Sequence, residues 1–285
     1  IPLAEKLKLY EERVRATVAA YPSCKSALIF HESYGGPVPP QLYGGEVTPL
    51  PERKRREAEQ LFEIGTAIAR MYREKFPGIK LVMGNSASST AIADAMFQLK
   101  YPKELFDFLG SESVGRFCMP ELFLESGGPH GAWFLQEIGR IYGYPQPVTA
   151  CYEWVGHIDR ELTQEERAQW LVRDALLAHS YGFDNIPLMT LYDVDDSYFN
   201  TQWGGGGACR RYPLLYPKPA YVAASVLTRE LDRARLVRRV PTGSLTVYAM
   251  EFARDNGEFI YPLWLPRGTA ELAVEFDSSP RARAT

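Results

Sequence analysis

The sequence has few cysteines, little net charge and no long apolar run, and each of these features excludes a class of protein. Its four cysteines lie far apart with no CxxC pair, so we interpret them mainly as free, buried thiols, with one disulfide as the alternative. The formal net charge of −3 gives no reason to expect nucleic acid or an anionic membrane as a partner. The longest apolar runs are only as long as a strand, so no transmembrane helix is expected.

Several catalytic motifs are missing as well. No Gly-x-Ser-x-Gly elbow is present, which argues against a serine hydrolase. The histidines show neither HExxH nor any paired ligand spacing, and the acidic cluster around Asp193 lacks the spacing of an EF-hand, so no metal site is predicted. The run Gly204 to Gly207 is not followed by Lys-Ser/Thr or by a helix start, so we interpret it as a mobile loop over the predicted site and not as a phosphate loop.

Strand and helix signals alternate along most of the chain. Five β-favouring runs are each followed by a helical pattern, and these runs are 26–32, 79–85, 106–112, 147–154 and 186–193. A further helix at 3–20 precedes the first of them. Strict alternation predicts a parallel sheet with right-handed crossovers, and therefore an α/β fold. The long loops mostly follow the strands, which predicts a site at the strand C-terminal ends.

Apolar periodicity predicts which faces of the helices are buried. Three- and four-residue steps mark a stripe on the first helix, made of Leu3, Leu7, Tyr10, Val14 and Val18. In the helix that ends before Pro77, the residues expected to face the core are Leu61, Ile64, Ile68 and Met71. Thr163 and Glu166 stand at capping-box spacing and predict the start of another helix.

The character of the sequence changes after residue 240. The segments Leu245 to Phe252 and Phe259 to Leu265 flank Asp255-Asn256-Gly257, which is a β-hairpin signal. Ala270 to Phe276 is expected to add a third strand. The sequence therefore predicts two domains, an α/β domain over 1–240 and a small β-sandwich-type appendage with its tail over 241–285.

Polar residues stand where the predicted strands end. Two of the strands end in a glutamate of the same local pattern, Ala27-Leu28-Ile29-Phe30-His31-Glu32 and Pro147-Val148-Thr149-Ala150-Cys151-Tyr152-Glu153-Trp154. In a (β/α) barrel, a strand ending in Glu presents a catalytic acid at the C-terminal rim. Further candidates for binding a substrate at this rim are His31, Asn85, Glu112, Trp154, Asp193 and Trp203.

The two glutamate-ending strands resemble those of the clan A glycoside hydrolases, and the chain is similar to the C-terminal part of a family 39-like member. Tyr216-Pro217-Lys218-Pro219-Ala220-Tyr221-Val222-Ala223 looks like the opening of the eighth helix in such enzymes. The resemblance implies a TIM (β/α)8 barrel that lacks its first three strands here, with the runs ending at Glu32 and Glu153 as strands four and seven. An N-terminal segment or a second chain is then the expected partner that completes the barrel.

The same resemblance implies a retaining glycosidase that cleaves a poly- or oligosaccharide without a cofactor. Glu153 would be the nucleophile and Glu32 the general acid and base. A retaining enzyme needs these two carboxyl groups about 5–5.5 Å apart across the glycosidic bond. One of them must stay protonated, which requires a pKa raised by burial and by the neighbouring charge.

One departure from the family pattern leaves other functions open. The chain has His31 before Glu32, where the clan usually has an asparagine that binds a sugar hydroxyl. A catalytically inactive, carbohydrate-binding relative is therefore the alternative, and a barrel hydrolase that uses Glu112 with Asp193 is a third reading. Sugar, linkage and oligomeric state stay open, and for the compartment a secreted or periplasmic location is favoured.

Overall fold

The computed structural model describes residues 2–30, 50–84, 89–112, 119–124, 132–154, 162–183, 186, 188–189, 191–193, 207–210, 214–271 and 273. These residues divide into two compact units, Ile1–Arg229 and Glu230–Thr285. Within the described parts of the chain, no helix combines the length and apolar character needed to cross a bilayer.

The first unit alternates helices with parallel strands. Its strands are β1 (Ser26–Leu28), β2 (Lys80–Met83), β3 (Phe108–Glu112), β4 (Val148–Trp154), β5 (Leu188–Met189) and the short pair β6 (Cys209–Arg210) and β7 (Tyr216–Pro217). Its helices are α1 (Leu3–Ala20), α2 (Leu50–Lys75), α3 (Ser89–Gln98), the 3-10 turn η2 (Lys103–Leu105), α4 (Pro120–Leu124), α5 (Ala132–Tyr142), α6 (Gln164–Ser180) and α8 (Pro219–Glu230).

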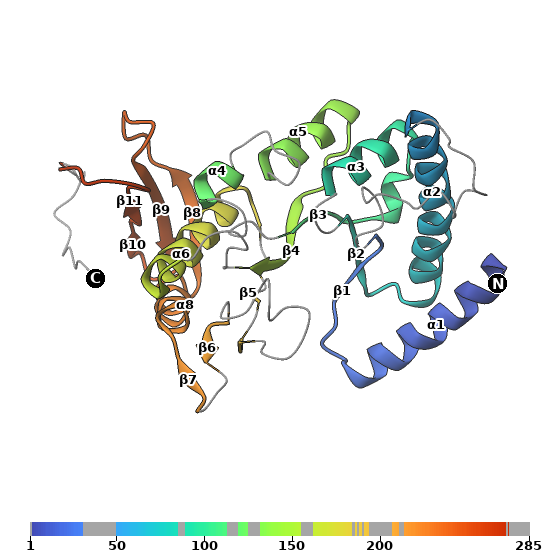
Figure 1. Cartoon of the computed structure of the whole chain (residues 1–285), viewed down its shortest axis with the longest axis horizontal. Coiled ribbons are helices and arrows are strands. Elements are labelled where there is room, and N and C mark those ends of the chain that lie inside the picture. The colour runs from blue at the N-terminus through green and yellow to red at the C-terminus, as the bar shows by residue number, and fades with distance from the viewer. Residues whose placement is uncertain are drawn as a thin grey trace. The chain divides into compact units, whose positions relative to one another are not determined.

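Five strands form one parallel sheet in the order β1-β2-β3-β4-β5 (Figure 1). The pairings Ala27↔Leu81, Val82↔Phe108, Leu109↔Val148 and Glu153↔Leu188 set the register. Neighbouring strands are neighbours in the sequence, and all five run in the same direction, as right-handed crossovers require. The α/β class and the parallel sheet expected from the sequence are confirmed.

The helices cover the sheet in chain order. α3 packs between α2 and α5, both α3 and α5 contact β3, and α1 packs against α2 (Figure 1). The stripe predicted on α1 is confirmed, because Val14 is buried and the other four stripe residues are half-buried, while the positions between them are mostly exposed. α6 begins as predicted, with a complete capping box in which Thr163 Oγ1 accepts from the N–H of Glu166 at 3.1 Å.

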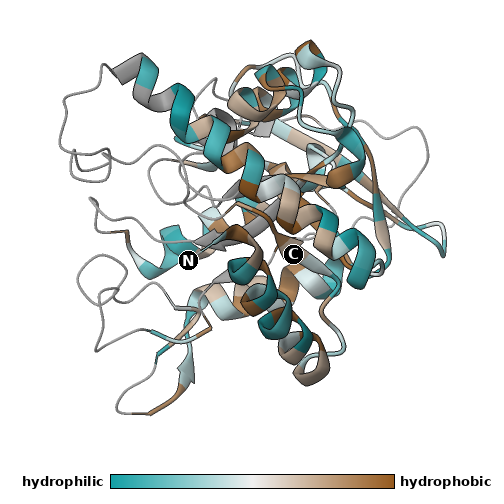
Figure 2. Cartoon of the chain, turned by 90° about the vertical axis from the view of Figure 1, so that its right-hand side faces the viewer, coloured by the Kyte–Doolittle hydropathy of each residue, from teal (hydrophilic) through white to brown (hydrophobic). Residues whose placement is uncertain are grey.

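The predicted buried face of α2 is confirmed at Met71, which is buried, and Leu61 and Ile68 are half-buried, but the prediction is wrong at Ile64. Ile64, expected in the core, is 39% exposed, whereas Gly65 and Ala69 are buried. A Cβ on Gly65 would overlap the ring of Phe30, which is itself 2% exposed. α2 therefore turns its small residues toward the sheet because the ring that follows β1 needs the room. Figure 2 shows the hydrophilic (teal) first turns of α2 and the more hydrophobic (brown) turns that follow.

Stacked aromatic rings pack together at the N-terminal ends of β3 and β4, in the segments that lead into these strands. The ring of Phe97, at the end of α3, lies 3.8 Å from that of Tyr144, and Phe106 stacks on the same pair. The hydroxyl of Tyr144 donates to the carbonyl oxygen of Tyr101 at 2.7 Å. Burying large rings in this way supplies much of the hydrophobic stabilisation of the unit.

The second unit contains a four-stranded sheet. β9 (Tyr248–Arg254) pairs antiparallel with β8 (Ala234–Arg239) on one side, and with β10 (Phe259–Ile260) and β11 (Leu263–Trp264) on the other. The unit begins at Glu230, before the expected boundary at 241, because the pairing of β8 with β9 attaches residues 234–239 to the appendage. The third strand predicted at 270–276 lies mostly outside the described residues.

Candidate functional site

The C-terminal edge of the parallel sheet gathers several of the predicted polar residues. β3 ends at Glu112, and Glu153 is the penultimate residue of the neighbouring strand β4. The register pairs Glu112 with Tyr152, so the backbones of the two glutamates are adjacent on neighbouring strands. Because the carboxyl ends of parallel strands meet at one edge, this edge is where an α/β sheet can assemble a site.

The pairing of β3 with β4 is irregular immediately before these glutamates. Ser111 pairs with Ala150, but the next pair is Glu112 with Tyr152, so β4 carries one extra residue, Cys151. One inserted residue reverses the face of the sheet on which the following side chains lie. Bulges of this kind occur preferentially beside active sites, where they re-aim a side chain. The register of β4 against β3 therefore shifts by one residue just before Glu153.

Asp193 lies just beyond β5 at the same edge and is engaged by the protein itself. Its carboxylate is buried and forms an ion pair with Nζ of Lys218, the residue before α8. The N–H of Gly207 donates to the same oxygen, Oδ1, at 3.0 Å. The carboxylate of Asp193, which the sequence predicts as a sugar ligand, therefore binds groups of the protein itself. These contacts join the segment after β5 to the start of α8.

The backbone around Asp193 reinforces this junction. The Asp193 N–H donates to the Cys209 carbonyl oxygen at 3.0 Å, and the Cys209 N–H donates to that of Leu191 at 2.8 Å. A Cβ on Gly207 would overlap the backbone of Tyr192 and Asp193, so glycine is needed for this close approach. The two ends of segment 194–206 are thereby held together beside the sheet edge.

A second cation, Arg167 on the first turns of α6, lies within electrostatic range of Asp193. Burial lowers the pKa of its guanidinium, and the Asp193 carboxylate opposes that shift. Its Nε is buried and makes no hydrogen bond within the described part of the structure. The sequence did not predict that Lys218, Gly207 and Arg167 lie near Asp193 at the C-terminal edge of the sheet. Only the position of Lys218 between two prolines, ahead of a helix, marks it in the sequence.

For the other predicted site residues, the structure describes either the backbone alone or nothing. His31, Glu32, Asn85 and Trp203 lie outside the described residues. Glu112, Glu153 and Trp154 are described by their backbone positions in β3 and β4. Ile29 and Phe30, which lead directly to His31, are buried with 8% and 2% exposure, so the chain enters that segment from the core.

Among the side chains that the structure describes, no group of three or more His, Cys, Asp or Glu is placed to hold a metal ion. Cys24 and Cys209 are free and half-buried, while Cys118 lies outside the described residues. Burial lowers the pKa of His179, which lies in the last turn of α6.

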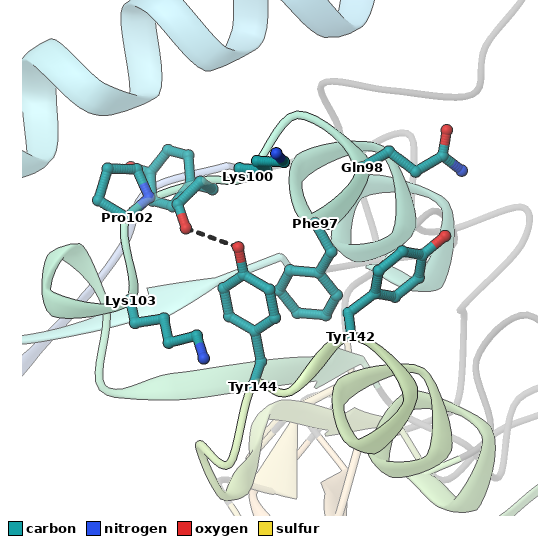
Figure 3. Close-up of a pocket in the computed structure, with 8 residues that line it drawn as sticks. Phe97, Gln98, Lys100, Pro102, Lys103, Tyr142 and Tyr144 are labelled. Atoms are coloured by element: carbon teal, nitrogen blue, oxygen red, sulfur yellow. Dashed lines mark hydrogen bonds between the residues drawn. The ribbon is translucent and has the colours of Figure 1, made fainter.

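A pocket of about 510 Å³ lies at the opposite end of the strands (Figure 3). It is lined by residues of the connections that lead into β3 and β4, among them Lys103 and Tyr144. It therefore belongs to the N-terminal edge of the sheet, away from Glu112, Glu153 and Asp193. We assign the candidate site to the C-terminal edge because that is where the strand-end carboxylates gather.

Comparison with known proteins bears on the fold. No protein-family model matches the sequence, and no curated protein matches it. Among solved structures, the chain is similar to a family 39 glycoside hydrolase from Bacteroides cellulosilyticus WH2. The identity is 17% and the TM-score 0.56, over 73% of this chain and 44% of that one.

Two further solved structures are similar over most of this chain. SrfJ from Salmonella typhimurium is 11% identical with a TM-score of 0.55, over 92% of this chain and 56% of that one. A monomeric β-xylosidase from Caulobacter crescentus CB15 is 14% identical with a TM-score of 0.52, over 88% of this chain and 52% of that one. The chain spans about half the length of these proteins. It therefore has a fold like that of the family 39 glycoside hydrolases, over about half of their length.

Proposed function

We propose that the protein is a retaining glycoside hydrolase that acts on a poly- or oligosaccharide by double displacement. Glu153 attacks the anomeric carbon and forms a glycosyl-enzyme intermediate, while Glu32 protonates the leaving oxygen. Glu32 then takes a proton from water, which attacks the same carbon and releases Glu153. Each half-reaction inverts the anomeric configuration, so the product keeps the configuration of the substrate.

The observation that carries this proposal is the position of Glu153 at the C-terminal end of β4, directly after a bulge and beside the end of β3. Two solved structures with a similar fold are a family 39 glycoside hydrolase and a β-xylosidase. A glutamate at a strand end of such a fold is placed to reach a sugar bound at the rim. A β-xyloside is therefore a suitable first substrate to test.

The proposal includes the architecture of a barrel. We propose that β1 to β5 correspond to strands four to eight, and that an N-terminal segment or a second chain supplies strands one to three. The strand order β1-β2-β3-β4-β5 supports this, since consecutive parallel strands with β1 at one end form an arc that further strands can close. Unpaired backbone groups on β1 would be satisfied by such a closure.

Covalent trapping tests the nucleophile directly. The full-length protein is incubated with a 2-deoxy-2-fluoro-β-xyloside carrying a good leaving group, and the labelled peptide is identified by mass spectrometry. We expect the label on Glu153, and retained configuration in the product of an unmodified aryl xyloside, followed by NMR. A label on another carboxylate, such as Glu112, would move the nucleophile there. Inverted product would exclude double displacement.

Substitution provides the second test. Glu153→Gln should lower kcat by at least about 10³-fold because the nucleophile is lost, with an unchanged fold by circular dichroism. Glu32→Gln should slow aryl glycosides with poor leaving groups more than those with good ones, because only the former need the acid. Glu12→Gln, at an exposed position of α1, is the matched control and should keep full activity. Full activity in both active-site variants would refute the proposal.

A carbohydrate-binding protein without turnover is the alternative function, favoured by His31 in place of the usual asparagine. Under this alternative, the protein would bind xylo-oligosaccharides with the same affinity before and after Glu153→Gln, and no reducing ends would appear on long incubation. The trapping experiment separates the two functions, since a protein without turnover forms no covalent intermediate.

A further inference from the structure

The pocket at the N-terminal edge of the sheet has the features of a binding site that the proposed reaction does not use. Its volume of about 510 Å³ lies within the range of pockets that hold a small ligand. Two connections supply its walls, the one from α3 to β3 and the one from α5 to β4. The lining residues are Phe97, Gln98, Lys100, Tyr101, Pro102, Lys103, Tyr142 and Tyr144 (Figure 3).

Aromatic rings held in fixed orientations form one part of the pocket. Phe97 and Tyr144 stack at 3.8 Å with their planes 15° apart, and both are almost fully buried. Tyr142 is 37% exposed and lies 5.8 Å from Phe97. Its hydroxyl donates to Oδ1 of Asp94 at 2.9 Å, which restrains the ring. An exposed ring that is already ordered can bind the apolar face of a sugar with little loss of conformational entropy.

The charged groups that line the pocket are both cations. Lys103 donates from Nζ to the carbonyl oxygen of Gly143 at 2.5 Å, and this ammonium lies 5.2 Å from the ring centroid of Tyr144. Because that partner is neutral, the charge of Lys103 is not cancelled by it. Lys100, the second cation, is exposed. The eight lining residues include no acid, and the neighbouring Asp94 carboxylate accepts hydrogen bonds from Tyr142 and Gln98. An ammonium only donates hydrogen bonds, so the pocket matches a ligand group that only accepts them.

Lys100 occupies a backbone position where glycine is usual. Its φ is 57°, and it ends α3 in a Schellman motif, in which Tyr101 N–H donates to Met96 and Lys100 N–H donates to Phe97. A lysine in this left-handed conformation is disfavoured relative to glycine. The conformation nonetheless leaves Lys100 among the residues that line the pocket (Figure 3).

We propose that this pocket is an accessory binding site for a run of acidic sugars, the uronate residues of a polysaccharide. One sugar packs on Tyr142, and carboxylates of the run accept hydrogen bonds from Lys100 and Lys103, which lie on different sides of Tyr144 (Figure 3). Since the pocket lies at the opposite end of the strands from Glu153, a polymer bound here leaves the candidate active site open. The site retains the polysaccharide on the protein and takes no part in bond cleavage.

The experiment measures binding in the Glu153→Gln variant of the full-length protein, by isothermal titration calorimetry. The ligands are a galacturonate tetramer and a galactose tetramer, which differ in the carboxylate. We expect the acidic tetramer to bind at least about tenfold more tightly, and its affinity to fall as salt is raised. Equal affinity for both tetramers, or no binding of the acidic one, would overturn the proposal. The measurement needs no turnover, so its result is independent of the proposed reaction.

Lys100→Gly is the decisive substitution, because glycine fits the left-handed position and the fold is retained or stabilised. It should weaken binding of the acidic tetramer about tenfold, and Lys100→Arg should restore most of it. Tyr142→Ala should weaken binding similarly. Lys8→Ala, an exposed lysine of α1, is the matched control and should bind as the parent does. Unchanged affinity in Lys100→Gly and Tyr142→Ala would refute the assignment. In the active protein, both variants should hydrolyse a small aryl glycoside at the parental rate.

Discussion

Arg173 on α6 holds Glu121 on α4 through two contacts inside the protein. Nη2 of Arg173 donates to Oε2 of Glu121 at 3.1 Å, and Nε lies 2.7 Å from Oε1. The two side chains are only 9% and 4% exposed. A planar guanidinium opposite a carboxylate can satisfy both oxygens at once, which compensates for the removal of two charges from water. The five-residue helix α4 is attached to α6 by this pair.

Arg173→Lys should therefore destabilise the first unit although it preserves the charge. Lysine offers a single ammonium and cannot contact both carboxylate oxygens in the way the planar guanidinium does. We expect a loss of about 2 kcal/mol in the free energy of unfolding, measured by urea denaturation. Arg140→Lys, in the exposed pair with Glu137, serves as the control and should change stability by less than about 0.5 kcal/mol. Equal effects at the two sites would contradict this account of the buried pair.

Gly65→Ala should destabilise the protein although alanine is the better helix former. In solvent, the exchange would stabilise a helix by about 1 kcal/mol. Here the added Cβ overlaps the ring of buried Phe30, and overpacking of this kind costs about 1–3 kcal/mol. Phe30→Leu in the same chain should recover part of the loss by making room. Gly78→Ala, where a Cβ meets no atom within 4 Å, should leave the melting temperature nearly unchanged.

The pair Asp193 and Lys218 should behave as one unit in a double-mutant cycle. Both side chains are buried, at 11% and 8% exposure, so Asp193→Asn or Lys218→Met alone removes one partner of a buried ion pair. Each single substitution should cost about 3–5 kcal/mol, and the double substitution should cost less than the sum of the two. Urea denaturation of the four proteins gives the coupling energy. Additive costs would mean that the ion pair does not act as a unit.

The contribution of Asp107 to stability should depend on pH. Burial opposes ionisation of its carboxyl group, but the Leu81 N–H, Lys80 and Arg73 outweigh this and hold its pKa below the ordinary value. A lowered folded-state pKa stabilises the protein above the unfolded-state value of about 3.9, and that stability is lost as pH falls through the lower folded value.

Asp107→Asn should therefore be less stable than the parent at pH 7, and the difference should shrink as the pH falls below about 4. Denaturation midpoints of both proteins between pH 2 and pH 7 measure it. The control is Asp232→Asn in the second unit, whose stability difference from the parent should not change in this way. A difference for Asp107→Asn that is constant across the whole range would show that the charge of Asp107 contributes nothing.

Local patterns were sufficient to predict the parts of the fold that depend on neighbouring residues. The capping box at Thr163 and Glu166 and the apolar stripe around Val14 each lie within a few residues of chain, and both are found as predicted. The parallel sheet followed from the alternation of strands and helices, because parallel strands need crossover connections.

The sequence pattern was insufficient where a residue's role depends on distant partners. The large apolar residues of α2 predicted a core face that included Ile64, but the ring of Phe30 decided the orientation of the helix, and small residues face it. Asp193 stays a predicted substrate ligand, and the structure adds a contact that its place after a strand does not indicate. Its ion pair with Lys218 joins residues 25 apart in the sequence, and no local pattern reveals it.

The sequence by itself determined the α/β class, the parallel sheet and the capped start of α6, because periodicity and turn residues act over short distances. Only the tertiary structure decided the bulge before Glu153, the engagement of Asp193 and the pocket around Tyr142. Each of these depends on which side chains meet across the sheet and its helices. Which side chains contact each other is determined by packing and by the pairing of charges across the whole fold, and not by local sequence.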